Sequence, residues 1–308
     1  GIAITFRIQE GSQFKIGQVG MAGDLIIPEA QLLEKVKITD EEYYNRDTLR
    51  QDVIALADLY SDEGYAYVDI SPRIAEDPEK LVVNITFDID KGKQVYFEEI
   101  TISGNTKTRD KVIRRQLQVY EQELYSGQRL KRSVQNLYRL DFFEDIKVNT
   151  TKGSGDDKMR LRIDVKEKNT GAFSIGAGFG NVENFFLTGS ISERNLFGRA
   201  QTLALQGQLG AKTTKFTLSF TEPWLFDIPL SAGVDVYNWK YEFSSYDKNS
   251  IGGNLRFGYP LFDYTRGYLS YGYDIANITD VDDNAANSIK SDEGKNIKSS
   301  VGARLKYD

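Results

Sequence analysis

The pattern of apolar and polar residues changes near residue 170. Beyond this point, segments of about ten residues alternate between apolar residues and polar residues or glycine. In the first of them Phe173 and Ile175 alternate with Ser174 and Gly176. This alternation predicts strands that have one apolar and one polar face. No helical segment follows that could cover the apolar faces, so we infer that they contact lipid and that the strands form a transmembrane β-barrel.

Eight segments carry this alternation, at residues 171–180, 184–193, 200–210, 214–221, 229–241, 249–259, 265–278 and 296–308. A tilted strand crosses a membrane in about 9–11 residues, so each segment can span one. The connections after the second, fourth and sixth segments share a Leu-Phe pair: Leu196-Phe197, Leu225-Phe226 and Leu261-Phe262. Alternate connections lie on one side of a barrel, so the aromatic turns mark one membrane interface and the polar loops the other. The alternative is a soluble β-sandwich whose turns are filled by Leu-Phe pairs.

The first half of the chain contains an internal repeat of roughly eighty residues. Ile4–Gly11 and Ile85–Gly92 have nearly the same alternating sequence, and each precedes a strand pattern that ends in Gly and an acid or amide, at Gly23 and Gly104. Two helical patterns and a strand complete each unit. The unit is therefore β-α-α-β-β, a small sheet covered by a helix pair. An open sheet edge can accept a strand from another chain, although the units could also serve only as spacers.

Composition narrows the classes of function. Zero Cys and zero His remove thiol nucleophiles, the usual general base and the common transition-metal ligands. The chain has no Gly-x-Ser-x-Gly motif, so no enzyme chemistry, cofactor or metal is expected. A net charge of -6 argues against a nucleic-acid partner. The chain also begins and ends inside strand patterns, which is typical of a piece of a longer protein.

Three motifs carry a family resemblance: Ser103-Gly104-Asn105 after a strand, Leu137–Phe143 before the next strand, and Lys166–Gly171 leading into the barrel. Together they resemble the POTRA repeats and barrel of the outer-membrane assembly factor family, of the bacterial BamA type. The resemblance implies an α+β fold of β-α-α-β-β POTRA repeats, followed by an antiparallel transmembrane β-barrel. About eight of sixteen expected strands are present. The implied bounds are the last strand of a preceding POTRA repeat (1–11), two POTRA domains (12–92 and 93–168) and the N-terminal part of the barrel (169–308).

The resemblance implies that the protein inserts β-barrel proteins into the outer membrane of a Gram-negative bacterium, with its POTRA repeats in the periplasm. The first barrel strand would then be the lateral gate that pairs with incoming strands, through Gly171, Phe173, Ile175, Gly176, Gly178 and Gly180. Glycine weakens a strand, which fits a gate, although small residues could also merely relieve crowding in the lumen. The alternatives are a relative that secretes or translocates a polypeptide, and a periplasmic scaffold anchored by a barrel.

The implied partners are unfolded outer-membrane β-barrel proteins, lipoproteins of an assembly complex, periplasmic chaperones and outer-membrane lipid. Strand addition to the POTRA units is expected at edge strands that run through Tyr67 and Asp69 and through Ile146 and Val148. The resemblance further implies a docking position for a partner at Glu121, near Arg114 and Arg115. The family carries Gly after this acidic residue, whereas this chain has Gln122.

Overall fold

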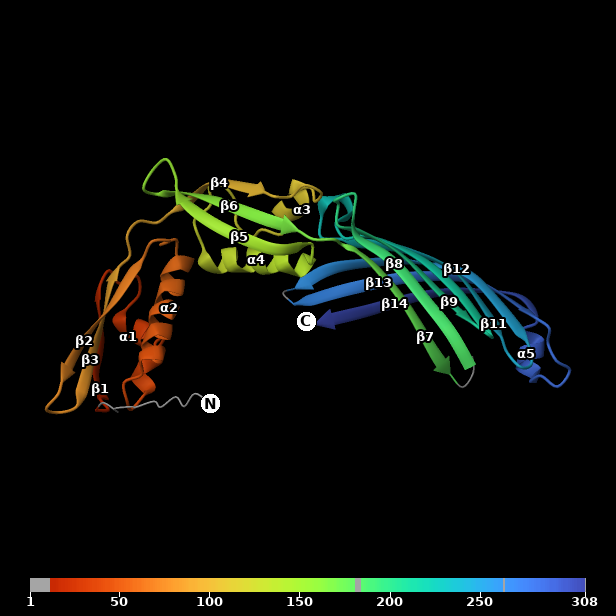
Figure 1. The fold of residues 1–308 in the computed structure, drawn as a ribbon, viewed down its shortest axis with the longest axis horizontal. Coiled ribbons are helices and arrows are strands. Elements are labelled where there is room, and N and C mark those ends of the chain that lie inside the picture. Colours follow the sequence, from red (N-terminus) through yellow and green to blue (C-terminus); the bar gives the residue numbers. More distant parts are fainter. Residues whose placement is uncertain (1–11, 181–183, 263, 308) are drawn as a thin grey trace, which may run out of the picture. The chain divides into compact units, whose positions relative to one another are not determined.

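The structure is a computed structural model that describes residues 12–180, 184–262 and 264–307. The strand expected at residues 1–11 lies outside the described residues. Contacts divide the chain into two units, one made of residues 1–104 and 113–166 and the other of residues 105–112 and 167–308. Three sheets account for the described strands, two small sheets in the first unit and a large sheet in the second (Figure 1).

The first repeat folds as the sequence predicts. Its elements are β1 (Lys15–Gly23), α1 (Glu29–Leu33), a 3-10 turn η1 (Ile38–Asp40), α2 (Arg46–Asp62), β2 (Asp69–Asp77) and β3 (Val82–Asp90). The central strand β3 runs parallel to β1 and antiparallel to β2. Asn45 caps α2 by accepting hydrogen bonds from the next turn. The buried side chains of Leu56 and Tyr60 on α2 pack in one core with Phe87 on β3.

The second repeat has the same order of elements: β4 (Tyr96–Ser103), α3 (Asp110–Arg114), α4 (Gly127–Leu140), β5 (Phe143–Lys152) and β6 (Lys158–Glu167). Its sheet has β6 between β4 and β5. Ser126 caps the start of α4, and the helix ends at Asp141, which adopts a left-handed conformation at φ 59°. Phe97, Leu137 and Leu161 are almost fully buried between sheet and helix. The predicted β-α-α-β-β unit is thus present twice.

The third sheet contains eight antiparallel strands in sequence order. They are β7 (Gly171–Gly180), β8 (Asn184–Leu196), β9 (Gln201–Gly210), β10 (Thr213–Glu222), β11 (Ser231–Glu242), β12 (Asp247–Phe262), β13 (Thr265–Thr279) and β14 (Gly294–Tyr307). The eight predicted segments are confirmed. A short 3-10 turn η2 (Leu225–Asp227) and a short helix α5 (Asn287–Ser291) lie in two of the connections. The Leu-Phe pair at Leu261-Phe262 belongs to the end of β12, because strand pairing continues there past a bulge.

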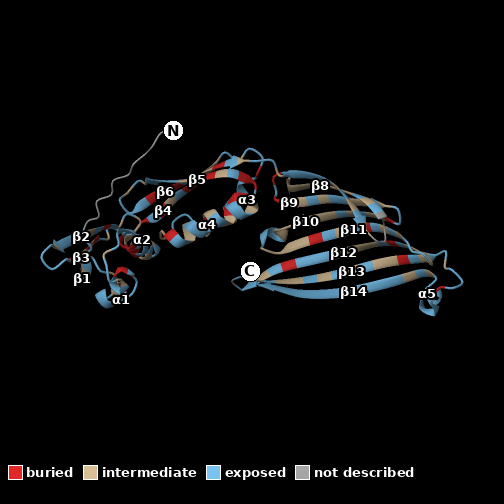
Figure 2. Ribbon diagram, turned by 60° about the horizontal axis from the view of Figure 1, so that its bottom comes forward, coloured by how far each residue is buried: buried red, intermediate tan, exposed pale blue. Residues whose placement is uncertain are grey.

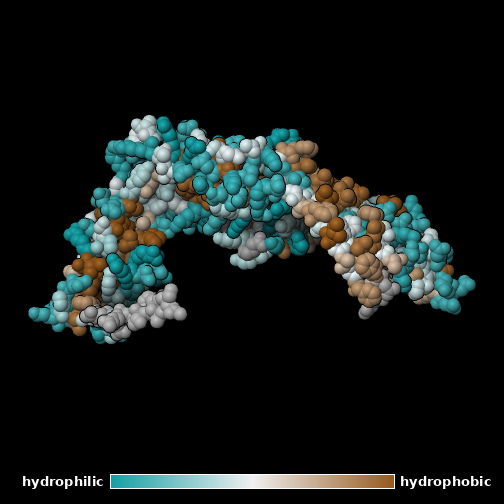
Figure 3. Space-filling view, in the orientation of Figure 1, coloured by the Kyte–Doolittle hydropathy of each residue, from teal (hydrophilic) through white to brown (hydrophobic). Residues whose placement is uncertain are grey.

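The barrel sheet differs from the repeats in how its side chains are buried. Buried residues gather in the two repeats, whereas the barrel strands are mostly exposed or half-buried (Figure 2). Figure 3 shows hydrophobic side chains at the surface of the barrel sheet. Within the described part of the chain, no helix combines the length and apolar character needed to cross a membrane.

Candidate functional site

The first barrel strand, β7, is the last strand at one side of the eight-stranded sheet. It pairs with β8 over its full length, from Gly171 opposite Glu193 to Gly180 opposite Asn184. All six residues predicted for the lateral gate lie in this strand. Within this part of the barrel the described residues place no second strand beside β7, so half of its backbone groups point to an edge that these eight strands do not pair.

One hydrogen bond identifies the backbone groups that face the open edge. The N–H of Arg194 donates to the carbonyl of Thr170 at 3.4 Å, so residues 170 and 194 form a hydrogen-bonded pair. Such pairs alternate along antiparallel strands, so even-numbered residues of β7 bond to β8. Odd-numbered residues, including Phe173 and Ile175, direct their N–H and carbonyl groups to the open edge. Their side chains are 71% and 73% exposed.

The glycines of β7 have different surroundings. A Cβ on Gly178 would lie 2.4 Å from Cζ of Phe186, whose ring covers this glycine from β8. A Cβ on Gly180 would have only an ordinary contact of 3.9 Å with the same ring. On Gly176 it would meet the flexible hydroxyl of Thr188 at 2.9 Å. Gly178 is therefore required by packing against an aromatic ring, and Gly180 is not.

Sequence reasoning missed Phe186. Counting across the short connection between β7 and β8 places Phe186 opposite Gly178, and this cross-strand pairing is the signal that could have found it. An aromatic ring that covers a glycine in a neighbouring strand supplies the packing that the glycine lacks. Phe186 therefore helps to hold β7 on β8.

The two faces of the barrel sheet follow the predicted alternation. Leu205, Leu218 and Val236 lie opposite one another across β9, β10 and β11, and all are about half exposed. On the other face, the guanidinium of Arg256 binds the carboxylate of Asp235, with Nε to Oδ2 at 2.7 Å. Apolar exposure on one face and ion pairs on the other suit a strand between lipid and a polar lumen.

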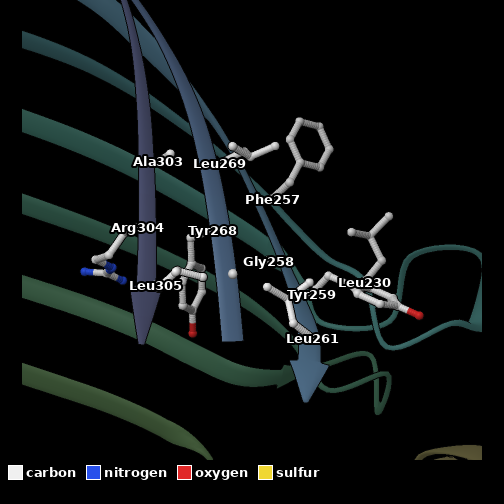
Figure 4. A pocket seen from close by; sticks show the side chains of 11 residues that line it. Leu230, Phe257, Gly258, Tyr259, Leu261, Tyr268, Leu269, Ala303, Arg304 and Leu305 are labelled. Carbon is white, nitrogen blue, oxygen red and sulfur yellow. The ribbon is translucent and has the colours of Figure 1, made fainter. Parts of the chain in front are cut away.

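A hollow interrupts the apolar face near the ends of β12, β13 and β14. It has a volume of about 550 Å³, and the small residues Gly267 and Ala303 contribute to its lining. Figure 4 shows Phe257 and Leu269 close together beside it. Phe257, Leu269 and Leu305 continue the apolar rows of the three strands, whereas Tyr268 and Arg304 belong to the rows of the opposite face.

Two of the turns at the Leu-Phe end of the barrel hold phenylalanine in a strained conformation. Phe197 has φ 54° and is 76% exposed, and Phe226 has φ 57° and is 83% exposed. A left-handed conformation costs a residue other than glycine about 1–2 kcal/mol. Phe262, at the end of β12, is 77% exposed. These exposed rings fit the membrane interface that the sequence predicts for this side.

In each small sheet, the chain itself covers one of the two edges. In the first repeat, the N–H of Tyr44 donates to the carbonyl of Phe14 at 2.9 Å beside β1. In the second, the N–H of Gln122 donates to the carbonyl of Phe97 at 2.6 Å, which covers β4. The opposite edges belong to β2 and β5. These are the strands for which the sequence predicts strand addition.

The predicted edge strand in the first repeat begins later than expected. Tyr67 was expected within it, but β2 starts at Asp69. The reason is a pair of tight turns after α2, in which Ala66 donates to Gly64 and Val68 donates to Tyr65 through their backbones. Asp69 lies in β2 as expected. In the second repeat, Ile146 and Val148 both lie in β5, where Ile146 is buried in the core.

The residues expected to dock a partner have structural contacts of their own. Glu121 lies in a turn beyond α3, and its carboxylate accepts a hydrogen bond from the N–H of Ile100 on β4 at 3.0 Å. Arg114 donates to the carbonyl of Ile100 and lies 3.9 Å from Glu121. Arg115 differs from the expectation, because its guanidinium nitrogens Nε and Nη2 are buried. Only Glu121 and Arg114 present a shared exposed surface.

Gln122 occupies a position that favours glycine. Its φ is 69°, in the left-handed region, and its N–H still bonds to the edge of β4. The turn therefore keeps its geometry in this chain despite the departure from the family pattern, at a conformational cost of about 1–2 kcal/mol.

Comparisons with known proteins agree with this architecture. The Omp85 superfamily domain matches residues 195–308. The surface antigen variable number repeat, the POTRA family, matches residues 14–92 and 95–168. The chain is 35% identical over 312 residues to the outer membrane protein assembly factor BamA of Nitratidesulfovibrio vulgaris. This alignment covers all of the chain and 39% of the relative. The chain thus spans about 39% of the length of this curated relative.

Two solved structures share the fold. BamA from Haemophilus ducreyi, lacking POTRA domains 1–3, aligns with a TM-score of 0.79 at 21% identity, over 95% of this chain and 58% of that chain. CdiB from Escherichia coli aligns with a TM-score of 0.50 at 15% identity, over 99% of this chain and 57% of that chain. Two POTRA repeats, the open eight-stranded sheet and these matches lead to one conclusion: the chain belongs to the Omp85 superfamily and is a BamA-type fragment with POTRA repeats and part of an outer-membrane barrel.

Proposed function

We propose that this chain is the part of an outer-membrane assembly factor that pairs the strands of unfolded β-barrel proteins with its own first barrel strand. The observation that carries the proposal is the glycine-rich sequence of β7, the first strand of the barrel sheet, because glycine weakens strand pairing and packing. An unpaired strand edge is costly in hydrocarbon, so a protein that offers one lowers the cost of inserting a new strand. The barrel lies in the outer membrane and the POTRA repeats lie in the periplasm.

The exposed edges of β2 and β5 support a role for the repeats in receiving clients by strand addition. The shared surface of Glu121 and Arg114 is the candidate position for an assembly-complex lipoprotein. Periplasmic chaperones would deliver the clients, and the apolar face of the barrel sheet would contact outer-membrane lipid. The chain would act by binding and by backbone pairing, without covalent chemistry.

Two proline substitutions in the complete protein test the open edge. Ile175→Pro removes an N–H that faces the edge, whereas Ser174→Pro removes one that bonds to β8. We expect Ile175→Pro to leave the barrel folded and to slow assembly of a foreign barrel in liposomes by up to about tenfold, the value of one hydrogen bond. Ser174→Pro should instead destabilise the barrel that carries it.

The same liposomes separate the alternatives. Clients inserted as folded barrels support the proposal. A client that crosses the bilayer into the interior of the liposome, and so becomes protected from external protease, indicates translocation. If Ile175→Pro folds normally and assembles clients at the rate of the unmodified protein, strand exchange at β7 is refuted. If the unmodified protein neither inserts nor translocates clients, a scaffold function replaces the proposal.

A further inference from the structure

The carboxylate of Glu167, the last residue of β6, is bound by the loop that follows β4. Its Oε2 accepts hydrogen bonds from the N–H and the hydroxyl of Thr106 at 2.9 and 2.8 Å and from the N–H of Lys107 at 2.9 Å. Its Oε1 accepts from the N–H of Thr108 at 2.6 Å. We call residues 106–108 the Glu167 cradle. Hydrogen bonds to an ionised carboxylate are stronger than those between neutral groups, so this attachment is strong.

The Glu167 cradle is in turn seated on the connection between β8 and β9. The side-chain amide of Asn195 donates to Oγ1 of the buried Thr108 at 2.8 Å. The N–H of Arg109 donates to the carbonyl of Gly198 at 2.9 Å. A Cβ on Gly198 would lie 1.9 Å from the carbonyl oxygen of Lys107, so only glycine permits this approach. All these residues belong to the unit that contains the barrel sheet.

The linker that follows Glu167 is also attached at its other end. The hydroxyl of Thr170 donates to the carboxylate of Glu193 on β8. The carbonyl of Thr170 accepts from the N–H of Arg194. The three residues between Glu167 and β7 are therefore held by β8 at one end and by the Glu167 cradle at the other.

The first repeat shows that the POTRA fold does not require this arrangement. In both repeats a glycine closes the first strand, with φ 88° at Gly23 and 85° at Gly104. A Cβ on Gly23 would approach the carbonyl of Ile89, and one on Gly104 the carbonyl of Val165, so these positions correspond. Two residues further on, the first repeat has Lys91 where the second has Glu167.

The loop of the first repeat is held from inside its own core. The hydroxyl of Tyr60 donates to the carbonyl of Asp24 at 2.9 Å and accepts from the N–H of Ile26 at 3.3 Å. Tyr60 lies 15 residues after its helix cap Asn45, and 15 residues after Ser126 the second repeat has Asp141. The second repeat thus has no tyrosine at this position, and its loop is held by Glu167 instead.

We propose that Glu167 is a positioning residue that fixes the periplasmic end of β7, so that the strand can exchange partners along its edge without leaving β8. This inference rests on the proposed function for its consequence in assembly, but its structural part can be tested alone. Because the linker is held at both ends, any separation of β7 from β8 should begin at the end of the strand near Gly180. Near that end, the ring of Phe186 over Gly178 holds the strand to β8.

Hydrogen exchange in the complete protein, reconstituted in lipid vesicles, tests the structural part. Glu167→Gln keeps the size of the side chain but replaces one acceptor oxygen with a donor NH2 group. We expect the backbone amides of Ala172 and Ser174 to exchange at least about tenfold faster in this variant, as loss of a charge-assisted hydrogen bond implies. Amides in β10 should not change. The matched control is Glu144→Gln, which removes only an exposed ion pair with Lys166.

A second pair of variants tests the same attachment from the barrel side. Gly198→Ala drives a Cβ into the Lys107 carbonyl, whereas Gly294→Ala also places alanine at a positive φ but meets no atom within 4 Å. Gly198→Ala should reproduce the faster exchange near Ala172, and Gly294→Ala should not.

The outcomes separate this inference from the proposed function. Faster exchange confined to the start of β7, together with slower client assembly, supports both. Faster exchange with unchanged assembly supports the attachment but removes its role in assembly. Unchanged exchange in Glu167→Gln and Gly198→Ala, or an equal rise in every barrel strand, overturns the positioning role whatever the assembly assay shows.

Discussion

The ring of Phe186 over Gly178 allows a quantitative test of how β7 is held. In Gly178→Ala the new Cβ would lie 2.4 Å from Cζ and 2.9 Å from Cε1 and Cε2 of Phe186, so the ring must move by about 1 Å to reach an ordinary contact. Overpacking of this kind costs about 1–3 kcal/mol. Replacing glycine in a strand returns about 0.5–1 kcal/mol. The expected net loss is about 1–2 kcal/mol.

Gly180→Ala is the matched control. Its Cβ would meet the same ring at 3.9 Å, without displacement. This variant should therefore show only the stabilisation of about 0.5–1 kcal/mol that comes from replacing a glycine in a strand. The two variants should differ by about 2 kcal/mol in the free energy of unfolding, although both place alanine on the same face of one strand.

The assay is urea unfolding of the complete protein in lipid vesicles, followed by tryptophan fluorescence. The double variant Gly178→Ala with Phe186→Ala completes a cycle, since removal of the ring should abolish the penalty of the new methyl group. Equal stabilities of Gly178→Ala and Gly180→Ala would refute the packing argument. So would a loss in Gly178→Ala that persists after Phe186 is removed.

Three further predictions follow from the faces, turns and charges of the structure. Leu218→Arg, on the apolar face, should lower the free energy of unfolding in lipid by roughly 2–4 kcal/mol, and Ser219→Arg, on the polar face, by much less. Equal urea midpoints for the two variants would mean that lipid does not contact Leu218. Gln122→Gly should raise thermal stability by about 0.5–1 kcal/mol, because relief of the left-handed strain exceeds the entropy lost by glycine, and calorimetry showing a lower midpoint would contradict this. Burial raises the pKa of the Glu167 carboxyl, but hydrogen bonds from Thr108 and its neighbours outweigh burial and hold the pKa below its ordinary value of 4.5. A depressed pKa stabilises the fold above about pH 4.5, and this stabilisation is lost as the pH falls through the folded-state pKa. Glu167→Gln should therefore make the free energy of unfolding depend less on pH in the acid range. Identical acid-range profiles for the variant and the unmodified protein would refute the role given to this carboxylate.

The sequence by itself determined the architecture. Strict alternation predicted all eight barrel strands, because a strand between lipid and a polar lumen must place apolar residues at every second position. The recurring glycine, helix and strand signals predicted two β-α-α-β-β units, because each of these signals acts over only a few residues. The same local pattern placed the six residues predicted for the lateral gate in one strand, as the structure has them.

The tertiary structure decided what each residue contacts. The alternation within single strands did not show that Phe186 covers Gly178 but not Gly180, because this depends on the register between two strands and on where the ring points. It placed Tyr67 in a strand that starts two residues later, since the turns after α2 compete with strand pairing there. In the sequence, Glu167 is only the polar residue that follows an alternating strand pattern. Its role depends on a loop about 60 residues earlier, and only folding brings that carboxylate within hydrogen-bond distance of four donors.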